Sequence, residues 1–344
     1  MASITENISL KRYNTFGIDV SARYFSSFAT EAQLTDLINM TPAPPLILGG
    51  GSNLLFTRDI DGLVLKNDIG GIDLVTEDED YVYVKAGAGE NWHSFVLHCL
   101  DRDWAGIENL SLIPGNVGAA PMQNIGAYGV EIKDVFYELE AYDLDEQKVY
   151  TFSLNDCGFG YRESVFKRKY RDRFVILNVT FRLCKRPVFH TSYGAIREEL
   201  EKTGVSQLSI QAISQAVINI RSSKLPDPKV IGNAGSFFKN PTVPNKQFEL
   251  LQEKFPGIVG YPNPISPTGS ASINSTKLAA GWLIEQCGWK GFRRGDAGCH
   301  GRQALVLVNY GNASGEEIYA LSEEILQSVE RKFGVMLERE VNII

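Results

Sequence analysis

Residues 114–129 read PGNVGAAPMQNIGAYG and form the most informative stretch of the chain. These sixteen residues include four glycines, three alanines and two prolines. So little side-chain bulk cannot build a hydrophobic core, so the backbone is expected to approach another group closely. That group is either a ligand or a tightly packed neighbouring domain.

A second glycine-rich stretch lies earlier in the chain, where LIL at 46–48 leads into GGGSN at 49–53 and LLF at 54–56. The pattern predicts a strand, a glycine turn and an apolar segment. Its unshielded backbone N–H groups suit a pyrophosphate. The loop lacks the G-x-G-x-x-G spacing of a dinucleotide fingerprint, so a bare glycine turn is the competing interpretation. Two such loops flanked by β-rich segments favour a long diphosphate ligand such as a dinucleotide.

Ser236 stands between small residues and two aromatics in NAGSFFKN, residues 233–240. A serine nucleophile needs a histidine base, and no histidine lies between residues 190 and 300. The G-x-S-x-G elbow of hydrolases is also absent. Ser236 is therefore a candidate proton donor, with a capped turn residue as the competing interpretation.

Charged candidates occur in two further motifs. Arg162, in GYRES at 160–164, suits a carboxylate or phosphate clamp, although solvent-exposed arginines are commoner. Glu340 lies in LEREV at 337–341. Strand alternation would place it with Glu338 on the face opposite the apolar residues, and that face is either solvated or functional.

Hydrophobic periodicity predicts an α+β fold of several domains, without regular βαβα alternation. Helices are predicted at 30–40, 92–100, 209–221, 277–287 and 317–333. Strand character is strongest at 81–86, 134–152 and 173–183. In the last of these, alternation predicts a single face made of Val175, Leu177, Val179, Phe181 and Leu183.

Composition narrows the class of function. A net charge of -7 argues against nucleic acid or an anionic membrane as a partner. No run of 18 apolar residues and no signal peptide are present, which predicts a cytoplasmic protein. The five cysteines and four histidines lack paired or metal-ligand spacing, so neither a disulfide framework nor a metal site is predicted.

Taken together, these motifs resemble the family of UDP-N-acetylenolpyruvoylglucosamine reductases, the MurB family. The matching segments are NTFGI (14–18), LGGGSNLLF (48–56), IPGNVGAAPMQNIGAYGVEI (113–132), FGYRES (159–164), KLPDPKVIGNAGSFFKNP (224–241), AAGWLIEQCG (279–288) and LEREV (337–341). They span nearly the whole chain in order, which makes the resemblance specific where one glycine loop would not be.

The resemblance implies three domains, two forming a vanillyl-alcohol-oxidase-type FAD-binding fold and a third that binds substrate. The expected boundaries are 1–70 and 71–221 for the FAD-binding parts, 222–334 for the substrate domain, and 335–344 for a C-terminal strand with the catalytic carboxylate. The segment HTSYGAI and the 185–222 insertion resemble the type I subgroup, in which a tyrosine on a mobile loop covers substrate. A monomer is expected.

The resemblance also implies an activity: NADPH-dependent reduction, through FAD, of UDP-N-acetylglucosamine enolpyruvate to UDP-N-acetylmuramate in peptidoglycan synthesis. The implied catalytic residues are Arg162, Ser236 and Glu340. The implied substrate contacts are Tyr193, Lys224, Asn240 and Gln303. The implied flavin contacts are Gly49, Gly50, Gly51, Ser52, Asn53, Leu54, Pro114, Gly115, Gly118, Ala119, Ile125, Gly126, Ala127, Tyr128 and Arg221.

The chain departs from the family pattern beside Glu340. Arg339 and Asn342 stand where a proline and a basic residue are expected, which puts the flavin-side contact of that strand in doubt. Arg221 is the substitute that we expect for this contact.

Two other functions compete with the reductase. A flavin-dependent alcohol oxidase of the same fold would often tether FAD through a histidine, and none occurs between residues 1 and 92. A flavin-free protein that binds sugar nucleotides is the second alternative, and a yellow colour would exclude it.

Overall fold

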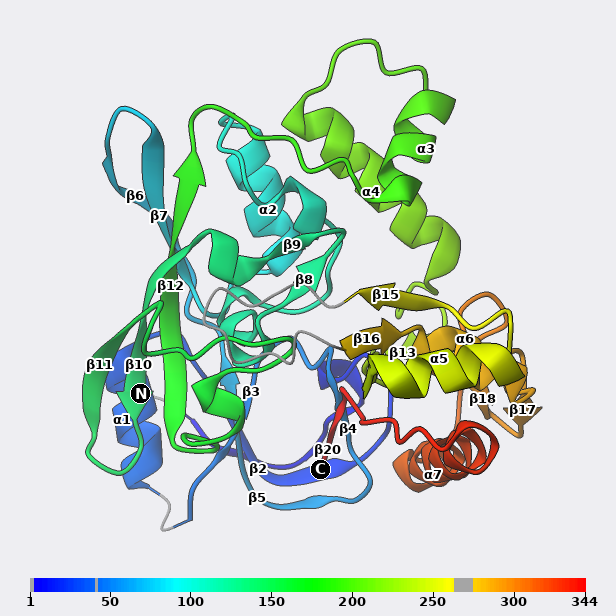
Figure 1. Cartoon of the computed structure of the whole chain (residues 1–344). Coiled ribbons are helices and arrows are strands. Elements are labelled where there is room, and N and C mark those ends of the chain that lie inside the picture. The colour runs from blue at the N-terminus through cyan, green and yellow to red at the C-terminus, as the bar shows by residue number, and fades with distance from the viewer. Residues whose placement is uncertain (1–2, 41–42, 263–274) are drawn as a thin grey trace. The chain divides into compact units, whose positions relative to one another are not determined.

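The computed structural model describes residues 3–40, 43–262 and 275–344 (Figure 1). The chain forms two compact units. The first unit comprises Met1–Ser9, Ser21–Gly51 and Asp59–Ser223, and the second comprises Leu10–Val20, Ser52–Arg58 and Lys224–Ile344. Two short N-terminal segments therefore belong to the same unit as the C-terminal third of the chain.

The first unit contains a sheet in the order β1-β2-β5-β3, formed by Thr5–Ser9, Ser21–Phe28, Ile60–Asn67 and Leu46–Leu48. The pair β1 and β2 is antiparallel, whereas β2 and β3 both run parallel to β5. Helix α1 (Glu31–Asn39) is capped by Thr30, whose hydroxyl accepts a hydrogen bond from the Gln33 N–H. Its buried Leu34 and Leu37 join Leu63 and Leu65 of β5 in a small core.

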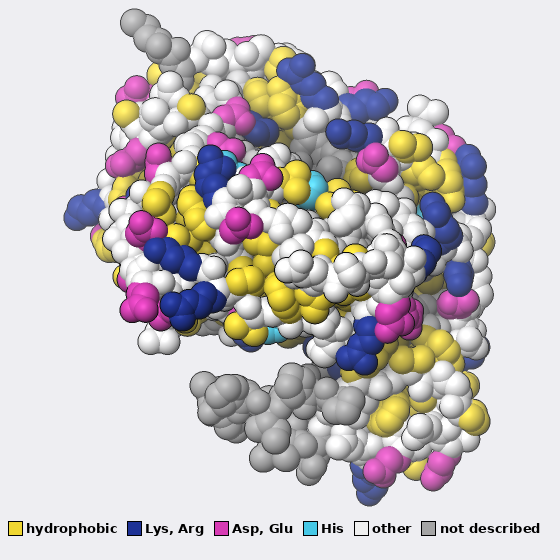
Figure 2. Space-filling model, turned by 90° about the horizontal axis from the view of Figure 1, so that it is seen from above, with side chains coloured by type: hydrophobic (Ala, Val, Ile, Leu, Met, Phe, Trp, Pro, Cys, Tyr) yellow, Lys and Arg dark blue, Asp and Glu magenta, His cyan; other side chains and the backbone are white. Residues whose placement is uncertain are grey.

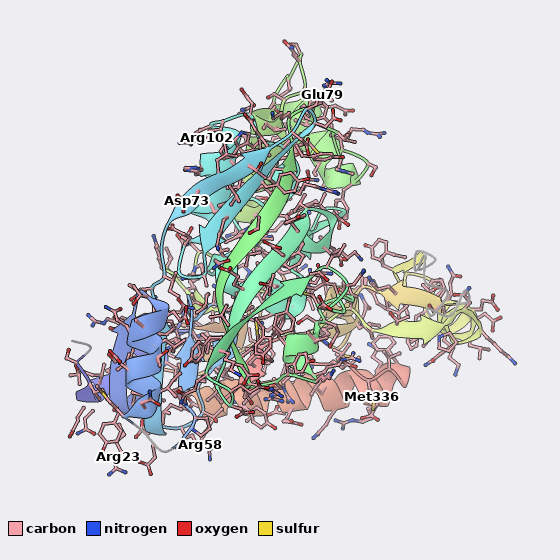
Figure 3. All side chains as sticks on the ribbon, turned by 90° about the vertical axis from the view of Figure 1, so that its left-hand side faces the viewer. Arg23, Arg58, Asp73, Glu79, Arg102 and Met336 are labelled. Atoms are coloured by element: carbon pink, nitrogen blue, oxygen red, sulfur yellow. The ribbon has the colours of Figure 1, made fainter. Side chains whose placement is uncertain are left out.

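A second sheet of the first unit has the antiparallel order β11-β10-β12-β7-β6. The strands are Lys148–Ser153, Phe136–Asp143, Phe174–Cys184, Tyr81–Gly87 and Ile72–Glu77. Helix α2 (Trp92–Leu100) packs Phe95 against Phe181 of β12, with 5.0 Å between ring centroids. Figure 3 shows Glu79 at the tip of the β6–β7 hairpin and Asp73 on β6.

The predicted single face of residues 173–183 is wrong in one respect. Val179, Phe181 and Leu183 belong to the large core of the first unit, but Val175 and Leu177 belong to the core beneath α1. The cause is a register shift in the β10–β12 pairing, which changes the face that the following side chains cover.

The first unit ends in two helices, α3 (Gly194–Lys202) and α4 (Ile210–Lys224), which lie side by side in Figure 1. Ile196 and Leu200 of α3 pack with Val217 and Ile220 of α4. Shorter elements precede them. These are η2 (Glu108–Leu110), η3 (Val117–Ala119), η4 (Pro121–Gln123), β8 (Gly126–Ala127), β9 (Val130–Glu131), η5 (Ile132–Asp134) and η6 (Val165–Lys167).

The second unit contains sheets in the orders β13-β19-β18-β17, β14-β16-β15 and β20-β4. The first is formed by Gly232–Asn233, Leu307–Asn309, Ala297–Cys299 and Arg293–Arg294. The second is formed by Thr242–Pro244, Ser275–Leu278 and Gly260–Pro262, and the third by Asn342–Ile343 and Leu54–Leu55. Three helices, α5 (Asn245–Lys254), α6 (Ala280–Gln286) and α7 (Gly315–Phe333), and the turn η1 (Lys11–Tyr13) complete it.

Helix α7 follows the sequence prediction closely. The helix predicted at 317–333 forms, Ser314 and Glu317 make a capping box at its start, and Gly334 ends it in the left-handed conformation at φ 64°. Gly315 is required at the first position, because a Cβ there would lie 1.7 Å from the Phe56 carbonyl oxygen. Met336, labelled in Figure 3, is exposed just after the helix.

The other predicted helices also form, although one of them starts later than predicted. Two helices of the structure were not predicted. The helix predicted at 277–287 begins at Ala280, because Ser275–Leu278 is strand β16. Helices α3 and α5 were not predicted, since their glutamates, lysines and glutamines leave few buried apolar positions to set a period.

Acidic and basic side chains are interspersed on the face that Figure 2 shows, in keeping with a net charge of only -7 over 344 residues. Within the described residues, no helix combines the length and apolar character needed to cross a bilayer. The same residues contain no cluster of histidine, cysteine and carboxylate side chains suited to a metal ion.

Candidate active site

The two glycine-rich loops predicted to bind flavin touch each other within the first unit. A Cβ at Gly50 would lie 2.6 Å from the Asn116 Oδ1 atom and 3.0 Å from the Gly115 Cα atom. A Cβ at Gly118 would lie 2.5 Å from that of Ala88. Only glycine fits at these positions, so the two loops pack closely against each other and form a cradle of backbone and small side chains.

The cradle is fixed by an asparagine that the sequence did not single out. Asn116 donates a hydrogen bond from Nδ2 to the Gly89 carbonyl at 2.7 Å. The neighbouring N–H groups of Val117 and Gly118 donate to the Glu90 and Ala88 carbonyls.

Arg162 lies on a turn that is tied to the glycine–alanine loop. Its Nη2 atom donates to the Gly126 carbonyl at 2.6 Å, and its backbone is left-handed at φ 55°. Asn124 donates from Nδ2 to the Gly160 carbonyl at 3.0 Å, and the Ser164 hydroxyl donates to the Met122 carbonyl at 2.7 Å. The structure thus joins the predicted carboxylate clamp to one of the predicted flavin loops.

Arg221 joins the same region of the first unit. Its Nε atom donates to the Leu112 carbonyl at 3.2 Å, and its guanidinium hydrogen-bonds with the side chain of Tyr128. Burial lowers the pKa of Arg221, and the nearby charge of Arg162 acts in the same direction. Burial raises the pKa of Tyr128, against the influence of Arg221. A partly buried pair of arginines favours an anion.

Three residues in this region adopt left-handed backbone conformations that non-glycine residues seldom take. Leu112, Tyr128 and Arg162 have φ angles of 58°, 51° and 55°. Each is bonded to Arg221 or interacts electrostatically with it. Such conformations cost free energy and persist where the surroundings enforce them, which is common at functional sites.

Tyr193 lies at the start of a helix. It is the residue before α3, and its carbonyl accepts a hydrogen bond from the Ile196 N–H at 2.9 Å. The ring is 49% exposed and meets the Tyr128 ring edge to face, with centroids 5.3 Å apart. The predicted substrate-covering tyrosine therefore packs on a residue of the predicted flavin loop.

Ser236 and Glu340 come together in the second unit. The Glu340 N–H donates to the Phe237 carbonyl at 2.8 Å, and Phe238 and Arg339 form a β-bridge. The predicted alternation is confirmed, because Leu337 and Val341 are buried while the Glu338 side chain is exposed. The two predicted catalytic residues thus lie on adjacent extended segments.

The turn before Ser236 is shaped by Asn233. This buried asparagine accepts a hydrogen bond from the Gly235 N–H at 2.9 Å, and Gly235 has a φ of 70°. Phe237, which follows Ser236, donates its N–H to the Leu305 carbonyl at 2.7 Å. Ser236 therefore lies between two hydrogen-bonded neighbours, Gly235 bonded to the Asn233 side chain and Phe237 bonded to the backbone of Leu305.

The remaining part of the first glycine loop lies in the second unit, next to Glu340. Asn53 donates from Nδ2 to the Glu340 carbonyl at 3.3 Å. Its own carbonyl accepts hydrogen bonds from the backbone and the side chain of Asn342. Strand β4, which includes Leu54, pairs in parallel with β20. Asn342, one of the departures from the family pattern, thus holds Asn53.

Arg339, the other departure, is an anchor to helix α7. Its guanidinium forms a salt bridge with Glu323 at 2.5 Å and donates to the Ser322 hydroxyl at 2.8 Å. The Arg339 side chain therefore fixes the residue before Glu340 to helix α7.

Two predicted substrate contacts meet at the start of helix α6. Asn240 accepts a hydrogen bond from the Ala280 N–H at 3.0 Å. The Oε1 atom of Gln303 accepts from the Leu305 N–H at 3.3 Å and lies 3.1 Å from the position of a Cβ on Gly281. Lys224 is exposed at the end of α4.

Comparison with known proteins gives the family. A family model described as UDP-N-acetylenolpyruvoylglucosamine reductase, C-terminal domain, matches residues 227–344, and an FAD binding domain model matches residues 24–152. The UDP-N-acetylenolpyruvoylglucosamine reductase of Flavobacterium johnsoniae is 49% identical over 343 residues, 99% of each chain. That of Pseudomonas putida is 51% identical over 341 residues, 98% of each chain. The chain belongs to the UDP-N-acetylenolpyruvoylglucosamine reductase family.

A solved structure agrees with this assignment at the level of the fold. The reductase MurB from Thermus caldophilus superposes with a TM-score of 0.69 at 24% identity, covering 100% of this chain and 99% of that one. The predicted α+β fold with an FAD-binding part is confirmed. Membership of the reductase family confirms an oxidoreductase and implies a role in peptidoglycan precursor synthesis.

FAD is the cofactor that the family models indicate, and the residues present fit it. The fit rests on the guanidinium groups of Arg162 and Arg221, which are partly buried and suit an anionic group such as a diphosphate, with Arg162 hydrogen-bonded to the predicted flavin loop at the Gly126 carbonyl. The individual flavin and substrate contacts, the catalytic roles and the three-domain boundaries stay predictions.

Proposed function

We propose that the protein catalyses the NADPH-dependent reduction, through FAD, of the enolpyruvyl ether of UDP-N-acetylglucosamine enolpyruvate to UDP-N-acetylmuramate. The observation that carries this proposal is the hydrogen bond from the Glu340 N–H to the Phe237 carbonyl, which joins the strand of Glu340 to that of Ser236. A hydroxyl and a carboxyl group on adjacent segments supply a proton donor and an enolate-stabilising group.

The overall reaction adds a hydride to C3 and a proton to C2 of the enolpyruvyl double bond, and NADPH is oxidised to NADP⁺. FAD, when bound, supplies the two-electron reducing chemistry. The protein must then hold the substrate carboxylate, stabilise negative charge on the enolate and protonate C2.

We assign these tasks to the three predicted catalytic residues. The Arg162 guanidinium, which also donates to the Gly126 carbonyl, pairs with the substrate carboxylate, and Arg162 itself has a left-handed backbone. The Glu340 carboxyl, when protonated, donates a hydrogen bond to the developing enolate, a contact worth about 3 kcal/mol when preorganised. The Ser236 hydroxyl gives its proton to C2, which is reasonable because an enolate is a strong base.

We assign substrate binding to four further residues. Lys224 pairs with the diphosphate of the UDP group, while Asn240 and Gln303, at the start of α6, hold the same portion of the nucleotide. Tyr193 covers the substrate from the start of α3. Arg221 contacts the flavin beside Tyr128. The division into domains at residues 1–70, 71–221, 222–334 and 335–344 is part of the same proposal.

The deciding experiment is NADPH oxidation by the purified yellow protein. We expect oxidation to depend on added UDP-N-acetylglucosamine enolpyruvate and to yield UDP-N-acetylmuramate. Oxygen consumption with a simple alcohol, without need for NADPH, would instead identify an oxidase. A colourless protein that binds the sugar nucleotide without reducing it would contradict both flavoenzyme functions.

A further inference from the structure

A buried segment at residues 108–112 links several parts of the first unit. The Trp92 Nε1 atom donates to the Leu110 carbonyl at 2.9 Å, and the Arg221 Nε atom donates to the Leu112 carbonyl. The Ser111 hydroxyl lies 2.8 Å from that of Ser214 on α4. This segment is therefore rigidly held against α2 and α4.

Asn109 is the member of this segment that reaches the region of Tyr193. Its side chain is buried, at 1% exposure. The Nδ2 group donates one hydrogen bond to the Tyr128 carbonyl at 3.1 Å and another to the His190 carbonyl at 2.9 Å. One amide thus uses both of its N–H groups to tie together two chain segments 62 residues apart by number (190 minus 128).

The oxygen of the same Asn109 amide, Oδ1, differs from its two N–H groups. Among the described residues, the buried Asn109 Oδ1 atom has no hydrogen-bond partner. A buried polar atom without a partner costs about 1–3 kcal/mol, so a smaller or apolar side chain would avoid a penalty that asparagine incurs here. The two donated bonds must outweigh it.

Both carbonyls that Asn109 holds are close to the Tyr128–Tyr193 ring pair. The Tyr128 carbonyl belongs to one residue of this edge-to-face pair, and His190 precedes the other by three residues. Three residues span at most about 11 Å, so fixing His190 confines the position of Tyr193. Downstream, the Ile196 N–H holds the Tyr193 carbonyl.

We propose that Asn109 is a positioning residue that sets Tyr193 against Tyr128 by fixing the backbones of Tyr128 and His190. The expected effect of Asn109 on the substrate KM rests on the proposed substrate contact of Tyr193. The expected effect on the mobility of residues 189–196 does not. Asn109 acts through Tyr193 and touches neither reacting group.

The structural test is hydrogen exchange of the ligand-free holoenzyme. Asn109→Ala should speed exchange of the amides in residues 189–196, which include the Ile196 N–H bonded to the Tyr193 carbonyl, by about threefold, as expected from the loss of the one Asn109 hydrogen bond, worth about 0.7 kcal/mol, that holds this segment. Asn109→Asp should do at least the same without a cavity, because its carboxylate faces two carbonyls. Ser111→Ala is the matched control, since it breaks a buried bond of the same segment that touches neither Tyr128 nor His190.

The kinetic test is a double-mutant cycle with Tyr193→Ala. Asn109→Ala should raise the substrate KM about five- to tenfold with kcat nearly unchanged, and should add less than about twofold when Tyr193 is already alanine. Should Asn109→Ala fail to fold, Asn109→Ser, which keeps one donor, gives the same comparison.

The outcomes separate the two proposals. Unchanged exchange at 189–196, or full additivity with Tyr193→Ala, overturns the positioning role of Asn109. If Tyr193→Ala leaves the substrate KM unchanged, the proposed substrate contact of Tyr193 is wrong, and exchange alone then decides the role of Asn109.

Discussion

The predicted catalytic residues of the two units are held in different ways. Arg162 lies on a left-handed turn, and side chains such as Asn124 and Ser164 tie that turn to the glycine–alanine loop. Ser236 and Glu340 lie on extended segments joined by backbone hydrogen bonds. Substitution of a strand neighbour such as Glu338 should therefore disturb Ser236 and Glu340 less than substitution of Asn124 disturbs Arg162.

The largest effect is expected for Ser236→Ala, which removes the proposed proton donor without touching the backbone ladder. Anaerobic NADPH should still reduce the flavin at nearly the parent rate, because this step needs no proton from Ser236. Reoxidation by substrate should slow by at least about 10²-fold, as is typical for loss of a positioned proton donor. Rapid-mixing absorbance measurements separate the two half-reactions.

Two further variants sharpen this result. Ser236→Cys should recover part of the loss, because a thiol donates a proton from a similar position. Glu340→Gln should also slow only the substrate half-reaction, through weaker stabilisation of the enolate. Slower flavin reduction with normal reoxidation in Ser236→Ala would make Ser236 a cofactor-positioning residue and end its role as proton donor.

A smaller effect is expected for Lys224→Ala in the second unit. Loss of a charged hydrogen bond worth about 1.5–3 kcal/mol should raise the substrate KM by about 10- to 100-fold. The protein should stay yellow. Lys229→Ala, which removes another exposed cation of the same region, is the control and should leave KM within about twofold. Flavin loss with normal substrate binding would place Lys224 on the other ligand.

The comparison between the units is tested directly by Asn124→Ala and Glu338→Ala. Asn124 also donates to Glu131 and accepts from the Lys133 N–H, so its loss should lower the free energy of unfolding by about 2–3 kcal/mol and reduce kcat. Glu338→Ala removes the exposed carboxylate of a salt bridge with Lys239, whose side chain is 13% exposed, and should change stability by less than about 1 kcal/mol. Thermal unfolding and turnover are measured for both.

Backbone strain contributes to the Asn124 effect, because Asn124 has a φ of 44°. Asn124→Gly should therefore be less damaging than Asn124→Ala by about 1 kcal/mol, while still losing the side-chain bonds. Equal losses of stability in Asn124→Ala and Glu338→Ala would refute the difference between the two units.

The smallest effect is expected in cysteine reactivity. Burial raises the pKa of Cys157 and of Cys299 to about 12, so both thiols are neutral at pH 8 and should resist iodoacetamide. Because these folded pKa values lie above the ordinary one, their contribution to stability is complete at pH 8 and is lost as pH rises toward 12.

Asn124→Ala should speed alkylation of Cys157 a few-fold, since the Cys157 carbonyl is bonded to Val165 just after the Arg162 turn. Cys299, in the second unit, should not change. Peptide mass analysis after timed alkylation reports both thiols, and equal acceleration of the two would indicate global loosening.

Much of the fold could be predicted from the sequence, because local signals coincide with the final structure. The capping box of Ser314 and Glu317 and the terminal Gly334 bound α7 without tertiary information. The strand β16 at Ser275–Leu278 could not be separated from the following helix, since its partners β14 and β15 are distant in sequence. The mixed faces of β12 arise from a register shift that only the pairing reveals.

In the candidate site, too, features set by local sequence were predictable and features set by distant partners were not. Glycine loops and the residues of matching motifs were predictable, but the asparagines that hold them were not. Asn109, Asn116 and Asn124 satisfy carbonyls up to 81 residues away in sequence, and no local pattern encodes such a partner. Their one signal is that asparagine commonly bonds backbone in irregular, glycine-rich segments.

The most direct test of the proposed function is a single turnover without NADPH. The flavin of the parent enzyme is reduced photochemically under anaerobic conditions and mixed with UDP-N-acetylglucosamine enolpyruvate. We expect the flavin absorbance to return at once and the sugar nucleotide to gain the mass of two hydrogen atoms. A flavin that stays bleached until oxygen is admitted, with the sugar nucleotide unchanged, would contradict the account.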